Sequence, residues 1–196
     1  GLDEVLKGGL RKNASILISG GPGTGKSILA LQFAYEGLKN NERVLYISSE
    51  ETKEALLNYA KSINVPIEKY LKNLTIHDQM AVDGRILSIE KPLDLIKKEK
   101  IKRVILDSLT LLEFVYSENI KDYRKGVLNF INKMKNKDVT LLVTSERSNT
   151  EIDNYLYKPE DFLFDGLILL NKIRKGSSYE RTITVAKMRG QNHSID

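Results

Sequence analysis

The stretch GGPGTGKS at residues 20–27 decides the fold of this chain. It follows an apolar run, SILIS at residues 15–19, and it leads into residues 25–39, whose apolar side chains recur at helical spacing. The pattern G-x-x-x-x-G-K-[ST] between a strand and a helix is typical of a phosphate-binding loop. At ordinary glycine usage, chance produces it in roughly one chain of this length in a hundred or two, and the flanking elements make coincidence rarer still.

Each part of this loop has a physical role. Glycines let the backbone turn tightly and direct successive N–H groups inward, where they bind phosphate oxygens. The N-terminus of the following helix adds the positive end of its dipole. We expect Lys26 to act on the β- and γ-phosphates and the Ser27 hydroxyl to be a ligand of Mg²⁺. The predicted nucleotide contacts are Gly21, Pro22, Gly23, Thr24, Gly25, Lys26, Ser27 and Ile28.

Strands and helices alternate along the rest of the chain. Strand patterns occupy residues 43–48, 74–77, 102–107 and 139–144, and helical patterns occupy residues 52–62, 88–100 and 120–136. Residues 166–172 and 179–187 predict a β-hairpin around residues 175–178. Because strands spaced by helices form right-handed crossovers, we predict an α/β fold: a mostly parallel central sheet flanked by helices, with an antiparallel C-terminal hairpin.

Acidic residues follow two of these strands, at the sheet edge where such folds bind ligands. Asp107 ends an apolar strand and is expected to hold the Mg²⁺ shell, often through water; the alternative is that Asp107 caps the next turn, with Ser108 following. Glu50 and Glu51 follow the second strand, where one carboxylate could polarise a water that attacks the γ-phosphate. The alternative there is that acidic residues favour the start of a helix.

Composition narrows the class of protein. A length of 196 residues suits one domain, and 41% hydrophobic residues argue against disorder. No apolar stretch approaches the ~18 residues of a membrane helix, so no membrane partner is expected. The absence of cysteine removes disulfides and thiolate metal sites and fits a cytoplasmic protein. The net charge is +5, but acidic and basic residues are interspersed along the chain. A solvated surface of mixed charge is therefore a simpler interpretation than a surface that binds polyanions.

Several motifs resemble those of KaiC-type ATPase domains in the RecA superfamily. They span nearly the whole chain in order: GLDEVLKGGL at 1–10, the phosphate loop with LALQF at 29–33, SEET at 49–52, LDSLT at 106–110, TSER at 144–147 and KMRG at 187–190. The resemblance implies one RecA-like P-loop NTPase domain over residues 1–196, with ATP and Mg²⁺ at the subunit interfaces of a homo-oligomer, usually a hexamer. Family members continue beyond the last motif, so we expect a domain truncated at its C-terminus.

The resemblance also implies roles for particular residues. Glu50 and Glu51 correspond to the paired catalytic glutamates, which act together with Lys26. Lys187 and Arg189 match a Lys-x-Arg that reaches the γ-phosphate of a neighbouring subunit, where cations supplied in trans would stabilise transition-state charge. An ordinary basic edge strand is the alternative for that pair. Ser145, Glu146 and Arg147 stand where the family senses the nucleotide.

Three functions are compatible with these residues. We favour a slow ATPase whose ring acts as a molecular switch on a protein partner. The second is a RecA- or RadA-like recombination or helicase ATPase that depends on single-stranded DNA and has the same fold. Tyrosines in loops could stack on that DNA. The simpler interpretation is that they are surface tyrosines in loops such as the polar, irregular segment at residues 149–161. The tyrosines concerned are Tyr116, Tyr123, Tyr155 and Tyr157. A nucleotide sensor without turnover is the third, and the catalytic-type residues argue against it.

Overall fold

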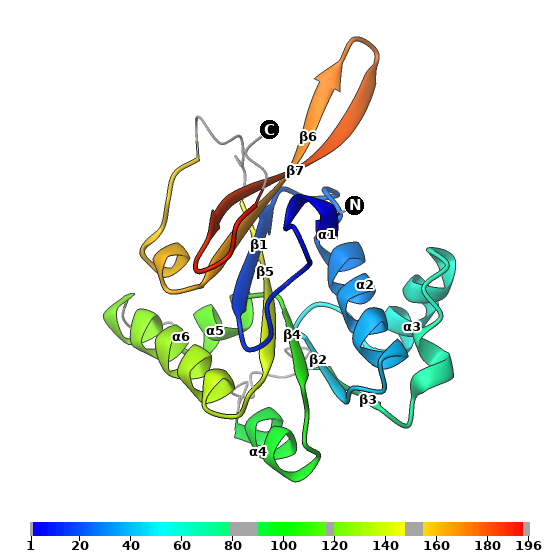
Figure 1. Ribbon diagram of the computed structural model, residues 1–196, viewed down its shortest axis with the longest axis vertical. Helices are drawn as coiled ribbons and strands as arrows, with labels where there is room; N and C mark the ends of the chain where they lie inside the picture. The colour runs from blue at the N-terminus through cyan, green and yellow to red at the C-terminus, as the bar shows by residue number, and fades with distance from the viewer. Residues whose placement is uncertain (1, 79–89, 117–119, 148–154, 194–196) are drawn as a thin grey trace.

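A seven-stranded sheet forms the centre of the molecule (Figure 1). The computed structural model describes residues 2–78, 90–116, 120–147 and 155–193. Strand order is β3-β2-β4-β5-β1-β6-β7, with parallel pairing throughout except for the antiparallel β6–β7 pair. The strands are β1 (Ser15–Gly20), β2 (Val44–Ser48), β3 (Leu74–Asp78), β4 (Arg103–Asp107), β5 (Thr140–Glu146), β6 (Gly166–Lys175) and β7 (Ser178–Met188). The predicted fold class is confirmed.

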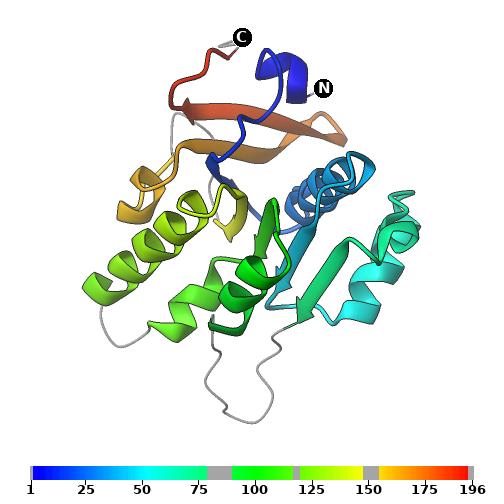
Figure 2. The same ribbon diagram turned by 60° about the horizontal axis from the view of Figure 1, so that its bottom comes forward.

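Helices cover both faces of this sheet, which is why its strands are continuous apolar runs rather than alternating ones. Figures 1 and 2 show α2 and α3 on one face and α4, α5 and α6 on the other. The helices are α1 (Leu2–Val5), α2 (Lys26–Lys39), α3 (Lys53–Ser62), α4 (Glu90–Lys98), α5 (Thr110–Val115) and α6 (Ile120–Lys135), with 3-10 helices η1 (Ile67–Tyr70) and η3 (Pro159–Phe162). Each face has its own core, one around α2 with Ile18, Ile105 and Leu142 and one around α6 with Leu17, Leu106 and Val143.

The pairing of β1 fixes where the functional loop emerges. β1 lies between β5 and β6, and its last residue, Gly20, stands opposite Glu146 and Leu170. β6 continues beyond Leu170, where it pairs with β7 alone, so the end of the hairpin extends past the rest of the sheet (Figure 1). The loop after β1 is therefore flanked by β5 on one side and by the β6–β7 hairpin on the other.

Some local expectations were confirmed and others were wrong. The helix predicted at residues 52–62 is confirmed as α3, and Thr52 caps it by accepting a 3.2 Å hydrogen bond from the N–H of Ala55. The first part of the irregular loop predicted at residues 149–161 lies outside the described residues. The prediction is wrong for its last part, where η3 forms and buries Glu160 and Asp161. α5 was not predicted, since it has six residues and is too short to show a helical period. No helix among the described residues is long and apolar enough to cross a bilayer.

Candidate nucleotide site

The phosphate loop connects β1 to α2, as its sequence predicts. Gly23 and Gly25 have φ of 70° and 106°, in the left-handed region that glycine tolerates best. The Thr24 hydroxyl donates a 2.8 Å hydrogen bond to the carbonyl of Gly21. A Cβ on Gly20 would lie 2.5 Å from Oγ1 of Thr24. The loop therefore keeps this shape only with glycine at these positions.

Lys26 lies across the base of this loop. Its ammonium donates 3.0 Å hydrogen bonds to the carbonyls of both Gly20 and Gly21. It also lies 3.9 Å from Oε1 of Glu146, at the end of β5. Ser27 follows in the first turn of α2 and is partly exposed. The structure thus brings Lys26, Ser27 and the loop backbone together, with a carboxylate from the neighbouring strand beside them.

Asp107 ends β4 and is held by hydroxyl groups from both adjacent strands. Tyr46 on β2 donates to Oδ2 at 2.7 Å, and the Thr144 hydroxyl on β5 donates to Oδ1. Burial, reinforced by the charge of Asp107, raises the pKa of Tyr46 well above its ordinary value, so the phenol remains a donor. The capping alternative for Asp107 is wrong, because the N–H groups of the next turn bond elsewhere: that of Ser108 donates to Oγ of Ser49 at 3.0 Å and that of Leu109 to the carbonyl of Thr144 at 2.8 Å.

The Asp107 carboxylate lies on the same face of the sheet as the phosphate loop. Ile105 packs into the core around α2, and side chains two residues apart on a strand point the same way. Tyr46 belongs to that same core. Neither Tyr46 nor Thr144 was predicted as a site residue. Their role depends on strand register between distant segments, which no local pattern in the sequence reveals.

The two glutamates after β2 have different surroundings. The Ser108 hydroxyl donates a 3.0 Å hydrogen bond to Oε1 of Glu50 and lies 3.0 Å from the Thr110 hydroxyl. Glu51 is anchored through its backbone instead, since its N–H donates to Oγ of Ser48 at 3.0 Å. Both residues are exposed. The carboxylate of Glu50 is therefore oriented from the end of β4.

The three residues predicted as nucleotide sensors separate in the structure. Glu146 faces Lys26, as described above, and Ser145 is buried within β5. The Arg147 guanidinium is buried with two acids of η3, 3.1 Å from Oε1 of Glu160 and 3.4 Å from Oδ1 of Asp161. These two acids gave no signal in the sequence, because a polar segment after a proline looks solvent-exposed.

Arg147 and Tyr155 connect this buried ion cluster to the loop. The backbone N–H of Arg147 donates to the carbonyl of Gly20 at 3.2 Å. The Tyr155 hydroxyl lies 3.0 Å from Oδ2 of Asp161 and 3.3 Å from Oγ of Ser19. Tyr155 is 6% exposed. It is therefore no surface tyrosine and has no free ring face on which a base could stack.

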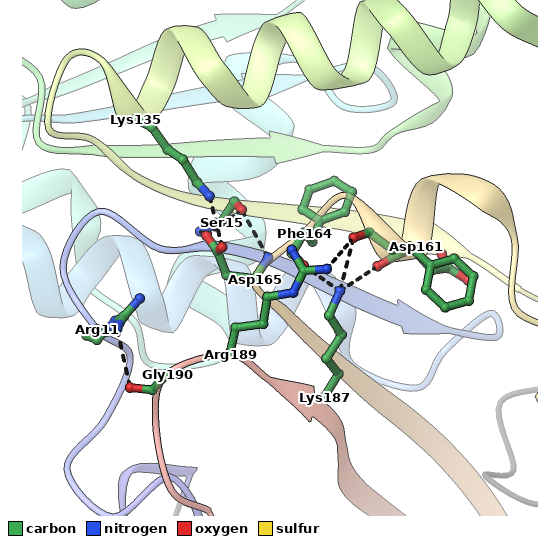
Figure 3. A network of polar contacts seen from close by, with 10 residues as sticks. Arg11, Ser15, Lys135, Asp161, Phe164, Asp165, Lys187, Arg189 and Gly190 are labelled. Carbon is green, nitrogen blue, oxygen red and sulfur yellow. Dashed lines mark hydrogen bonds and ion pairs between the residues drawn. The ribbon is translucent and has the colours of Figure 1, made fainter.

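Lys187 and Arg189, predicted to act in trans, lie on either side of Met188, the last residue of β7, and bond to carbonyls at the end of η3 and just after it (Figure 3). The Lys187 ammonium donates to the carbonyls of Phe162 at 3.2 Å and Phe164 at 2.6 Å. The Arg189 guanidinium donates to the Phe162 carbonyl at 3.1 Å. Burial, followed by repulsion from Arg189, lowers the pKa of Lys187. Both cations thus cover carbonyl groups of their own chain.

These two cations lie far from the phosphate loop of the same chain. Met188 pairs with Gly166, which stands beside Ile16 near the start of β1, whereas the loop follows Gly20. Four residues of strand separate the two levels, roughly 13 Å at the usual rise per residue. The antiparallel direction of β7 is what places its end there. The structure does not bring Lys187 and Arg189 to the phosphate loop of their own chain.

The chain is similar to known proteins along nearly its whole length. The family model described as an ATPase, KaiC, matches residues 1–196. The circadian clock oscillator protein KaiC of Prochlorococcus marinus subsp. pastoris is 31% identical over 209 aligned positions, which cover 98% of this chain and 40% of that protein. The KaiC of Parasynechococcus marenigrum has the same identity and coverage, and that of Nostoc sp. is 29% identical with 98% and 39% covered. The chain spans about two-fifths of the length of these relatives.

Proposed function

The chain belongs to the KaiC family of ATPases, and from this we propose that it binds ATP with Mg²⁺ at residues 20–27 and hydrolyses it slowly, as one subunit of a ring. One observation carries the proposal. Asp107 is fixed by hydroxyl donors from both neighbouring strands on the face where the phosphate loop and Lys26 lie. A carboxylate held beside a phosphate loop is the arrangement that P-loop NTPases use to bind a phosphate-bound metal.

The donor groups present fit Mg²⁺ held mainly by phosphate, hydroxyl and water oxygens. Among the described residues no group of three or more His, Cys, Asp or Glu could hold a metal ion. Ser27 would supply a direct hydroxyl ligand, and Asp107 would accept hydrogen bonds from metal-bound water through its remaining lone pairs. Bound Mg²⁺ would neutralise charge on the β- and γ-phosphates.

Hydrolysis assigns roles to Lys26 and Glu50. Lys26 would exchange its bonds to the loop carbonyls for the phosphate oxygens, which carry full charge and bind an ammonium more strongly. Glu50 would accept a proton from the water that attacks the γ-phosphorus, while the bond from that phosphorus to the β–γ bridging oxygen breaks and ADP leaves. The hydrogen bond from Ser108 holds one oxygen of Glu50 and leaves the other for that water.

Lys187 and Arg189 would serve the site of a neighbouring subunit. They lie about 13 Å along the strands from their own loop, so a second copy of the chain is the partner whose nucleotide they could reach. Doing so requires them to leave the carbonyls of Phe162 and Phe164. Hydrolysis would then depend on assembly, most simply a hexameric ring that changes its affinity for a protein partner. We place the protein in the cytoplasm, since the reaction needs a continuous supply of ATP.

The test is Mg²⁺-dependent ATP hydrolysis with and without single-stranded DNA. Lys26→Ala should remove the activity, and Lys39→Ala, an exposed lysine at the far end of the same helix, should keep it. Slow turnover indifferent to DNA supports the switch. Strong stimulation by DNA would instead support the recombinase or helicase alternative; of the tyrosines considered for stacking, Tyr155 is buried and Tyr157 is exposed. ATP binding without turnover would mean a sensor.

A further inference from the structure

The β6–β7 hairpin presents a basic and aromatic surface on the same side as α2. Ile168 and Leu170 of β6 pack into the core around α2. Lys172 is the next residue of β6 in that alternation, so its side chain leaves the same face. It stands opposite Arg181 of β7, and the next pair on that face is Arg174 with Tyr179. This surface begins immediately beyond Leu170, the residue level with the start of the phosphate loop.

Lys172 reaches over the loop. A Cβ built on Gly23 would lie 3.9 Å from the Lys172 ammonium. The same ammonium lies over the ring of Tyr179, 5.4 Å from its centroid. A cation over the face of an aromatic ring is attracted to it, and the attraction restricts where an exposed lysine side chain spends its time. The contact with the ring of Tyr179 therefore restricts the Lys172 ammonium to a position beside the loop.

The charge of Lys172 is not paired within the hairpin. Glu180, the acidic residue between positions 166 and 188, bonds to Lys175 at 3.0 Å. Glu180 stands opposite Ile173 and so faces the other side of the hairpin. Arg181 beside Lys172 adds a second positive charge. Two cations next to a loop with the glycine pattern of a phosphate-binding loop create a site that attracts an anion of high charge.

We propose that Lys172 is a further nucleotide-binding residue, which contacts the phosphates of a nucleoside triphosphate from the hairpin side of the loop while Tyr179 positions it. The proposal rests on the proposed function, because it assumes that residues 20–27 hold those phosphates. Lys26 would approach from within the loop and Lys172 from outside it. The role belongs to no phosphate-loop motif, since it depends on the register between β1 and β6.

The test compares the affinity for a non-hydrolysable ATP analogue with Mg²⁺, measured by calorimetry at low and high salt. Lys172→Gln should weaken binding about five-fold at low salt, as expected for one partly solvated charge near the phosphates. The same substitution should also make the affinity for the analogue less dependent on salt concentration. Lys175→Gln removes an equal charge from the same hairpin on the side away from the loop, and should change the affinity less than two-fold. Lys172→Arg keeps both the charge and the ring contact and should restore affinity.

Substitutions of Tyr179 provide a second test of the proposal. Tyr179→Leu should weaken binding about two-fold to three-fold by releasing Lys172 from the ring. In a Lys172→Gln background the same change should have no effect, because the ring would act only through the lysine. Tyr179→Phe keeps the aromatic face and should leave affinity unchanged.

Two results would overturn the proposal while leaving the proposed function intact. One is an unchanged affinity in Lys172→Gln although Lys26→Ala abolishes binding. The other is an equal loss in Lys172→Gln and Lys175→Gln, which would mean that only the overall charge of the hairpin matters. If Lys26→Ala itself binds normally, the proposed function fails, and the proposal for Lys172 fails with it.

Discussion

Tyr46 of β2 donates a 2.7 Å hydrogen bond to Oδ2 of Asp107 on the adjacent strand β4. The phenol is fully buried, and its removal leaves the half-buried carboxylate with only the hydroxyl of Thr144 as a side-chain donor. We expect Tyr46→Phe to lower the free energy of unfolding by about 1.5–3 kcal/mol, the range for hydrogen bonds to charged groups. Denaturant unfolding of the two proteins measures this.

The matched control for that change is Tyr35→Phe. Tyr35 packs edge-on against Tyr70 on the outside of α2, with ring centroids 5.9 Å apart, and the substitution removes only its hydroxyl. We expect this substitution to change the free energy of unfolding by less than about 0.5 kcal/mol, as most surface substitutions do. If both changes shift the unfolding midpoint equally, the bond from Tyr46 to Asp107 makes no special contribution.

The different surroundings of Glu50 and Glu51 predict unequal effects on turnover. Ser108 orients the carboxylate of Glu50, whereas Glu51 is anchored by its backbone. Glu50→Gln should lower kcat about 10²-fold to 10⁴-fold, the usual contribution of a general base. Glu51→Gln should lower it less than ten-fold, and neither change should alter nucleotide affinity much. Steady-state kinetics, with separate binding measurements, shows which substitution lowers kcat more. A larger loss in Glu51→Gln would make Glu51 the base.

The buried ion cluster on η3 predicts a large loss of stability. The side chains of Arg147, Glu160 and Asp161 are 8%, 7% and 1% exposed. Arg147→Met would leave two buried acids without their cation, at a cost of about 3–5 kcal/mol in unfolding free energy. Lys175→Met breaks the exposed pair with Glu180 and should cost less than about 1 kcal/mol. A similar small loss for both would show that the acids are solvated in the folded protein.

The distance between the β7 cations and their own loop predicts complementation between defective subunits. Lys26→Ala subunits alone and Lys187→Ala/Arg189→Ala subunits alone should both be inactive. Equal mixtures should recover activity at about a quarter of the wild-type sites, because each active site then needs an intact loop next to an intact β7 end. Mixing without recovery, although the subunits co-assemble, would mean that both groups serve the same subunit.

Asp165 predicts a loss of stability in acid. Burial opposes its ionisation, but bonds from Lys135 at 2.8 Å and from the N–H and hydroxyl of Ser15 at 2.9 and 2.8 Å outweigh this, and the pKa of Asp165 lies below its ordinary value (Figure 3). A lowered folded pKa means that its contribution is present above the unfolded value of about 4 and is lost as the pH falls below it. Unfolding measured from pH 7 to pH 3 should show this.

Asp165→Asn should flatten the acid side of that profile and lower stability at neutral pH. Asp122→Asn is the control, since Asp122 is exposed and lies 4.0 Å from its partner Lys125. The control should keep the shape of the wild-type profile. If Asp165→Asn keeps it too, other carboxylates govern the acid transition.

The elements that sequence reasoning found are those whose signal is local. Long apolar strands, amphipathic helices and the glycine pattern at residues 20–27 each follow from neighbouring residues, and all appear in the structure. η3 was missed because its acids are buried against Arg147, which follows β5 and is distant from them in the local pattern of the sequence. α5 was missed because it is too short for a helical period to appear.

The same distinction holds for the candidate site. The loop residues and Asp107 could be placed from sequence, since each follows a recognisable strand. Tyr46, Thr144 and Lys172 could not, because they meet the site through parallel strand pairs that join segments distant along the chain. Sequence also gave no reason to expect that Lys187 and Arg189 would bond to carbonyls of their own chain.

The reversed direction of β7 gives the subunit two unlike ends, one with the phosphate loop and one with Lys187 and Arg189. When such subunits associate head to tail, every contact joins a donor end to an acceptor end, which is a heterologous contact. Under the proposed role in trans, an open row would always have one loop that no neighbour completes. Closing the row into a ring would complete that last site, so closure would add a catalytic centre without adding a subunit.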